Sequence, residues 1–153
     1  MKARLNPYQA APEAMKAMIA LENHIRASGL DPTLAELVKI RASQINGCAY
    51  CLNMHTGEAT AKGETAERIF LLDAWRESPL YSPRERAALA WTEAVTLVAN
   101  SRVPDEVFEE ARAQFGEEEL VKLTLLINAI NAWNRFGVAF RSVHPVKQAA
   151  HAA

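Results

Sequence analysis

Apolar residues recur along the chain at three- and four-residue intervals, the spacing that places them on one face of a helix. The six glycines and seven prolines fall mostly where these periodic stretches begin or end, as expected of helix boundaries. No stretch gives a convincing strand. The pattern therefore predicts an all-α bundle of about seven helices, over residues 12–28, 31–46, 48–63, 65–77, 82–100, 104–116 and 117–143.

The last predicted helix is apolar on most of its sides between Leu120 and Trp133. A helix that is hydrophobic all round is normally buried on all sides. In a chain of 153 residues, part of that burial is expected to lie in a subunit interface. The sequence therefore predicts an oligomer.

Length and charge narrow the class of protein. A chain of 153 residues is expected to form a single domain over residues 1–153. The formal net charge of −1 argues against a nucleic-acid-binding surface, which is normally basic. No apolar run is long enough for a membrane span, and Pro7 interrupts the chain too early for a signal peptide. We therefore expect a cytoplasmic protein with no nucleic-acid or membrane partner.

The two cysteines, Cys48 and Cys51, form a Cys-x-x-Cys pair at the predicted start of a helix. A secreted disulfide scaffold has more cysteines at wider spacing, so the pair indicates redox chemistry or a metal site. Free N–H groups and the helix dipole favour a thiolate in the first turn, and such thiols titrate below the ordinary pKa of about 8.5. The pair is thus a candidate nucleophile at neutral pH.

His55 and Glu36 extend this site. Cys48, Cys51 and His55 share one helix face, and the four-residue spacing makes His55 a neighbour of Cys51. Residues 31–46 and 48–63 form a predicted hairpin, in which Glu36 and His55 lie about 15 Å and 12 Å from the turn. An antiparallel pair therefore places the Glu36 carboxylate beside the imidazole, where it would fix the tautomer and raise the basicity. Cys48, nearest the helix start, is expected to be the more exposed of the two cysteines.

The spacing Glu36-x11-Cys48-x2-Cys51-x3-His55 resembles the signature of the alkylhydroperoxidase D-like branch of the carboxymuconolactone decarboxylase superfamily. The segments 82–95, 103–106 and 131–135 also resemble parts of this family, so most of the chain is covered. One position departs from the pattern, because Tyr50 stands where that branch carries a histidine before the second cysteine. A phenol is not a base near pH 7, although it can donate a hydrogen bond.

The resemblance implies an all-helical subunit that assembles as a homo-trimer or homo-hexamer, with no metal and no organic cofactor. It implies a dithiol that reduces peroxides, with Glu36 and His55 relaying protons to Cys51. The implied partners are a peroxide substrate and a dithiol reductant such as a lipoyl protein or a thioredoxin-like protein. The decarboxylase activity of the superfamily's name belongs to members without the cysteine pair and is not expected here.

These observations predict an antioxidant enzyme, a thiol-dependent peroxidase with Cys51, Cys48, His55 and Glu36 as catalytic residues and Tyr50 as a possible accessory group. In the predicted cycle, Cys51 attacks the peroxide and Cys48 closes the disulfide. Two alternatives stay open at this point. The first is a redox sensor or disulfide reductase without peroxide turnover. The second is a structural protein in which Cys48, Cys51, His55 and Glu36 hold zinc.

Overall fold

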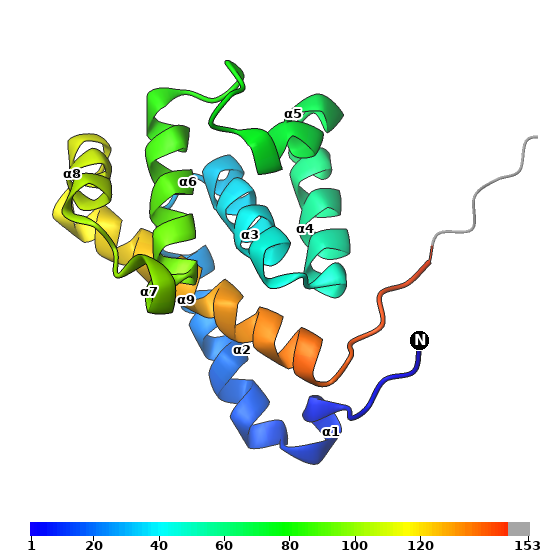
Figure 1. Cartoon of the computed structure of the whole chain (residues 1–153). Helices are drawn as coiled ribbons and strands as arrows, with labels where there is room; N and C mark the ends of the chain where they lie inside the picture. Colours follow the sequence, from blue (N-terminus) through cyan, green and yellow to red (C-terminus); the bar gives the residue numbers. More distant parts are fainter. Residues whose placement is uncertain (147–153) are drawn as a thin grey trace, which may run out of the picture.

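A computed structural model describes residues 1–146, and this part of the chain contains helices and no strand (Figure 1). The all-α prediction is therefore confirmed, while the predicted domain end at residue 153 lies outside the described residues. The helices are α1 (Pro7–Ala10), α2 (Pro12–Arg26), α3 (Pro32–Asn46), α4 (Ala49–Ala61), α5 (Ala66–Leu71), the 3-10 helix η1 (Leu72–Ala74), α6 (Pro83–Thr96), α7 (Val98–Ser101), α8 (Asp105–Gln114) and α9 (Glu117–Ala139).

Local signals in the sequence set several of these helix starts. The Asp31 side chain accepts a hydrogen bond from the Leu34 N–H at 2.7 Å, which caps α3. Ser82 and Glu85 form the reciprocal hydrogen bonds of a capping box at the start of α6. Proline follows both caps, at the position where its missing N–H has no intrahelical partner. These two boundaries agree with the sequence prediction.

Other boundaries differ from the prediction. The helix expected over residues 65–77 ends at Leu71 and tightens into η1, which brings Leu72 and Trp75 into the core beside α3 and α6. The helix expected over 82–100 is divided at Leu97, where the backbone leaves helical geometry (φ −98°, ψ 31°). The last helix ends at Ala139 rather than near residue 143. The short helix α1, capped by Asn6, was not expected at all.

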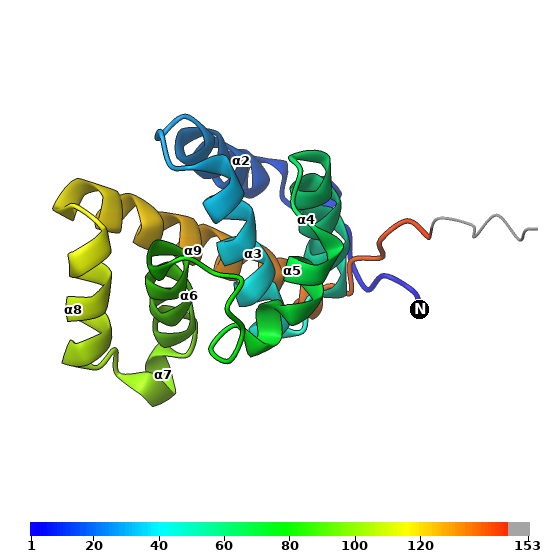
Figure 2. The same ribbon diagram turned by 90° about the horizontal axis from the view of Figure 1, so that it is seen from above.

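Helix α3 lies at the centre of the bundle and packs against α4, α6 and α9 (Figures 1 and 2). The beginning and the end of the described chain lie at the same side of the molecule in both views. Two hydrogen bonds join them, from the Arg4 backbone N–H to the Phe140 carbonyl at 2.9 Å and from the Arg4 guanidinium to the Ala139 carbonyl at 3.0 Å. The segment before α1 is thus tied to the end of α9.

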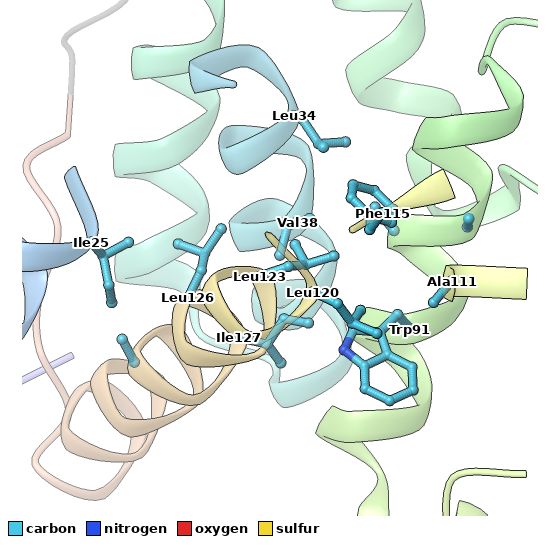
Figure 3. Close-up of a cluster of buried hydrophobic side chains, with 13 residues drawn as sticks. Ile25, Leu34, Val38, Trp91, Ala111, Phe115, Leu120, Leu123, Leu126 and Ile127 are labelled. Carbon is cyan, nitrogen blue, oxygen red and sulfur yellow. The ribbon is translucent and has the colours of Figure 1, made fainter. Parts of the chain in front are cut away.

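The largest group of buried apolar side chains surrounds α9 and includes residues from α2, α3 and α6 (Figure 3). Leu123, Leu126 and Ile127 of α9 are fully buried, and each such side chain stabilises the fold by about 1.5–3 kcal/mol. Contacts within one chain therefore bury most of the apolar residues between Leu120 and Trp133, so the apolar pattern does not by itself require a partner subunit. Val121 and Val138 of α9 remain exposed, at 69% and 49%.

No helix among the described residues has both the length and the apolar character needed to cross a membrane.

Candidate active site

The turn between α3 and α4 places the cysteine pair at the end of a helical hairpin. Gly47 ends α3 in the left-handed conformation (φ 64°), which glycine adopts without steric cost. Cys48 then acts as the N-cap of α4, and its Sγ atom accepts a hydrogen bond from the Cys51 N–H at 3.4 Å. A cysteine sulfur thus occupies the position where a serine or aspartate oxygen usually caps a helix.

The hairpin brings Glu36 of α3 beside His55 of α4, as the residue counts from the turn predicted. Glu36 Oε2 lies 2.9 Å from His55 Nδ1, and both residues are buried. The second carboxylate oxygen accepts a hydrogen bond from Lys62 Nζ at 2.6 Å. Burial alone would raise the pKa of Glu36, but the hydrogen bonds from His55 and Lys62 outweigh it and lower that pKa to about 2.

The ionised Glu36 carboxylate can only accept hydrogen bonds, so it selects the His55 tautomer that carries a proton on Nδ1. The other ring nitrogen, Nε2, is then free to act as a base. Glu36 is therefore an orienting partner for a general base. Lys62 is the second partner of the Glu36 carboxylate, and this contact was not anticipated from the sequence.

The two cysteines share one proton unequally. The pKa of Cys48 is lowered to about 6, chiefly because the Cys51 thiol donates a hydrogen bond to it and because the Cys51 backbone N–H does so as well. The pKa of Cys51 is raised, first by the hydrogen bond that it donates to Cys48 and then by burial. The reduced pair therefore holds its negative charge on Cys48 at neutral pH.

Titration of the reduced protein is expected to show one thiolate per subunit with a midpoint near pH 6, because the pKa of Cys48 is lowered to about 6. Absorbance at 240 nm, followed from pH 4 to pH 9, measures the thiolate directly. The Cys48→Ser variant should lose this transition. A midpoint above pH 8 in the parent protein would contradict the assignment.

A cavity of about 520 Å³ opens beside Cys51. Helix α4 contributes one wall of it, formed by Tyr50, Cys51, Met54 and His55. The other walls come from the N-terminal segment, α2, and the end of α9 with the residues after it: Ala3, Leu5, Asn6, Pro7, Tyr8, Met15, Ile19, Glu22, Asn23, Arg26, Trp133, Phe136, Gly137, Ser142 and Val143. Its size suits an organic molecule rather than a single small peroxide.

Access to the two cysteines differs from the prediction. Cys48 was expected to be the more exposed, but its exposed fraction is 1%, against 3% for Cys51, and it is not among the residues that line the cavity. The reason is the close approach of α9, which passes over the start of α4. A Cβ atom on Gly137 would lie 2.8 Å from Cys48 Sγ, closer than atoms can approach without displacement. Glycine at position 137 therefore allows α9 to cover Cys48.

Two buried asparagines of α9 were missed by the sequence analysis. Asn134 and Asn131 lie on α9, and the Asn46 side-chain NH₂ donates to the Oδ1 atom of each at 2.9 Å. Their spacing of three residues within an otherwise apolar helix was the signal that could have found them. Asn134 lies between Ile130 and Gly137 on the face of α9 that packs against the cysteines.

The four proposed zinc ligands are not brought together. Among residues 1–146, the His, Cys, Asp or Glu donor atoms that gather within 4.8 Å are those of Glu36, His55 and Glu58, a group that includes neither cysteine. The Lys62 ammonium already lies against Glu36 in this group. The arrangement of the described residues therefore does not support zinc held by both cysteines.

A match to the Carboxymuconolactone decarboxylase family extends over residues 12–94, which includes Glu36, both cysteines and His55. The chain belongs to this family.

Related sequences and a solved structure place it more closely. It is 48% identical over 139 residues to the uncharacterized Bacillus subtilis protein YdfG, covering 91% of this chain and 95% of that one. It is 32% identical over 114 residues to the uncharacterized Escherichia coli protein YnjA, covering 74% of this chain and 62% of that one. A crystal structure from Agrobacterium tumefaciens matches with a TM-score of 0.94 and 51% identity, over 95% of this chain and all of that one. That protein is of unknown function and is described as a candidate antioxidant defence protein AhpD. Within the family, the chain lies in the AhpD-like branch.

A more distant structure shares the fold. The debrominase Bmp8 matches with a TM-score of 0.78 and 22% identity, over 90% of this chain and 74% of that one. The shared fold therefore does not by itself define the reaction of this chain.

Proposed function

We propose that this protein is a thiol-dependent peroxidase that acts in antioxidant defence by cycling Cys48 and Cys51 between dithiol and disulfide. The observation that carries the proposal is the arrangement around the cavity. Cys51 and His55 both line the cavity. Cys48 is hydrogen-bonded to Cys51 but is buried away from the cavity. A substrate in the cavity thus meets the Cys51 sulfur first, and the Cys48 sulfur lies behind it, where it can close the disulfide.

In the first step, His55 accepts the Cys51 proton and the Cys51 sulfur attacks one peroxide oxygen. The O–O bond breaks, and the protonated His55 returns the proton to the departing alkoxide. The products are an alcohol and a sulfenic acid on Cys51, so the sulfur is oxidised and the peroxide is reduced. Glu36 supports this step by stabilising the positive charge that forms on His55, at 2.9 Å.

In the second step, the Cys48 thiolate attacks the Cys51 sulfur. The S–S bond forms, and the departing hydroxide takes a proton from solvent to become water. The lowered pKa of Cys48 favours this step, because the resolving sulfur is already a thiolate at neutral pH. The sequence assigned Cys51 as the attacking sulfur and Cys48 as the resolving one, and the position of the cavity supports that order.

An external dithiol then restores the pair. One of its sulfurs attacks Cys51, and Cys48 leaves as a thiolate, a favourable leaving group because of its low pKa. The second sulfur of the reductant releases Cys51 and closes its own disulfide. Because both cysteines are buried, a slender lipoyl arm that enters the cavity fits this step better than the broad surface of a thioredoxin-like protein.

The remaining features of the proposal follow from the sequence and from its family resemblance. The active protein is proposed to be a cytoplasmic homo-trimer or homo-hexamer that needs no metal or organic cofactor. Tyr50, 38% exposed, lines the cavity beside Cys51 and is the accessory group that would donate a hydrogen bond to a bound substrate.

Steady-state turnover tests this function. Purified protein would receive cumene hydroperoxide and dihydrolipoamide, with reductant consumption followed over time. Many turnovers per subunit are expected, and the Cys48→Ser variant should stop after one equivalent because it cannot form the disulfide. If the parent protein itself stops after one equivalent with this reductant and with a thioredoxin system, it is a redox sensor and the proposed function is wrong.

A further inference from the structure

The surroundings of the two sulfurs are mostly apolar where α9 crosses the start of α4. Ile130 and Trp133 of α9 pack around the cysteines, and Gly137 lies against Cys48. Asn134 lies on the same helix between Trp133 and Gly137, and it is completely buried. Because a buried polar group without partners costs several kcal/mol, each hydrogen-bonding atom of this side chain needs a partner.

The hydrogen bonds of Asn134 fix which way its amide points. Its oxygen accepts from Asn46 Nδ2 at 2.9 Å, and its nitrogen donates to Ser43 Oγ at 3.0 Å. An amide nitrogen carries two hydrogens, and one of them is used by Ser43. Ser43 itself lies next to the pair, since its carbonyl accepts the Cys48 backbone N–H at 3.0 Å. The second amide hydrogen is therefore available to the sulfurs.

We propose that Asn134 is a catalytic residue that donates a hydrogen bond to the reacting sulfurs and stabilises the thiolate, and that Asn46 is a positioning residue that orients it. This proposal adds Asn134 to the dithiol cycle described above. It rests on the proposed peroxidase function only for the part that Asn134 plays in turnover. In such a cycle the negative charge moves from one cysteine to the other. A donor that faces both sulfurs stabilises it at each stage, as an oxyanion hole does for oxygen.

The electrostatic surroundings agree with this role. The pKa of Cys48 is lowered first by Cys51, and a hydrogen bond from Asn134 acts in the same direction. At Cys51, where the Cys48 hydrogen bond and burial raise the pKa, Asn134 opposes the rise. The other titratable groups at the site are Tyr50 and His55 of α4, with Glu36, Glu58 and Lys62 on the Nδ1 side of the imidazole. Helix α9 presents none there, because its residues against the cysteines are Ile130, Trp133, Asn134 and Gly137.

Asn131 provides a matched control. It is buried on the same helix one turn earlier, and it accepts a hydrogen bond from the same Asn46 nitrogen group at the same distance of 2.9 Å. Its own amide nitrogen, however, donates to Thr96 Oγ1 at 3.0 Å and to the Ile127 carbonyl at 2.9 Å. Replacing Asn131 thus disturbs the same buried network without removing a donor to sulfur.

The experiment measures two equilibrium properties of the full chain, neither of which needs a peroxide. The first is the midpoint of the thiolate absorbance at 240 nm, and the second is the dithiol/disulfide equilibrium constant against lipoic acid. In Asn134→Leu the midpoint should rise by at least about one pH unit. The equilibrium should shift about tenfold toward the disulfide, or about 30 mV to more negative potential, because the thiolate of the reduced form loses its donor. Asn131→Leu should change neither.

Asn134→Asp keeps the shape of the side chain and the hydrogen bond from Asn46 but loses the donor, so it serves if the leucine variant does not fold. It should raise the midpoint at least as far, since its carboxylate also repels the thiolate. A folded Asn134 variant with an unchanged midpoint would overturn the proposal, and so would an equal shift in Asn131→Leu. If the shifts occur in a protein that does not turn over peroxide, this inference stands and the proposed function fails.

Discussion

Peroxide turnover in the Cys51→Ser variant is expected to fall at least about 10³-fold, because removing the attacking group of a nucleophilic cycle costs a factor of this order or more. Cys51 is the cysteine that lines the cavity, so a peroxide bound there has no other sulfur to meet. Cys48→Ser keeps the attacking sulfur and should still react once per subunit. The rate of dihydrolipoamide oxidation with cumene hydroperoxide measures the first effect.

Trapping of the sulfenic acid separates the two cysteines. In Cys48→Ser, treatment with one equivalent of peroxide and then dimedone should add one label to the peptide that contains Cys51, as read by mass spectrometry. In Cys51→Ser, the peptide that contains Cys48 should stay largely unlabelled, because that sulfur is 1% exposed and lies outside the cavity lining. Rapid labelling of Cys48 in this variant would reverse the proposed order of attack.

Glu36→Gln is expected to lower both turnover and stability. Loss of the carboxylate removes the partner that orients His55, and general acid–base catalysis typically contributes 10²–10⁴-fold, so turnover should fall about 10²-fold or more. The pKa of Glu36, about 2 in the folded chain, lies below its ordinary value of about 4.3. The ionised form therefore stabilises the fold by about 3 kcal/mol at neutral pH, and the variant should lose most of this.

The pH dependence of unfolding tests the same carboxylate. The pKa of Glu36 is lower in the folded chain than in the unfolded chain. Its contribution to the free energy of unfolding is therefore complete above about pH 4.5 and is lost as the pH falls toward 2. Urea unfolding of the parent should weaken over that interval by more than in Glu36→Gln. Glu58→Gln is the matched control, since Glu58 Oε2 lies 3.7 Å from His55 Nδ1 but its side chain is 36% exposed. Equal losses in both variants would contradict the special position of Glu36.

The hairpin of α3 and α4 shows how far the sequence alone could lead. Both helices have clear boundaries, and Gly47 makes the turn between them short. Their rise per residue therefore predicted correctly that Glu36 and His55 would lie side by side. The helix break at Leu97 was harder to foresee, since no proline or glycine marks it and the apolar pattern continues through it.

The exposure of the cysteines could not be obtained in the same way. Whether Cys48 is open or covered depends on α9. This helix approaches closely only because its residue 137, 89 positions after Cys48, is glycine. Asn134 belongs to the same long-range contact. Its partners Ser43 and Asn46 lie on α3. The three-residue spacing of Asn131 and Asn134 marks two unusual polar positions in α9, but it does not show that one of them lies against the cysteines. Tertiary contacts of this kind decide burial but leave no periodic trace.

The tie between the N-terminal segment and the end of α9 holds both ends of the described chain against the wall of the cavity that carries the reactive residues. Cys51 and His55 belong to the stretch 12–94 that matches the family, whereas Leu5, Tyr8 and Phe136 on the other walls lie outside it. Substitutions in the two ends of the chain can therefore change the shape of the cavity without touching Cys51 or His55. The range of molecules that the cavity admits can thus be altered separately from the chemistry of the cysteine pair.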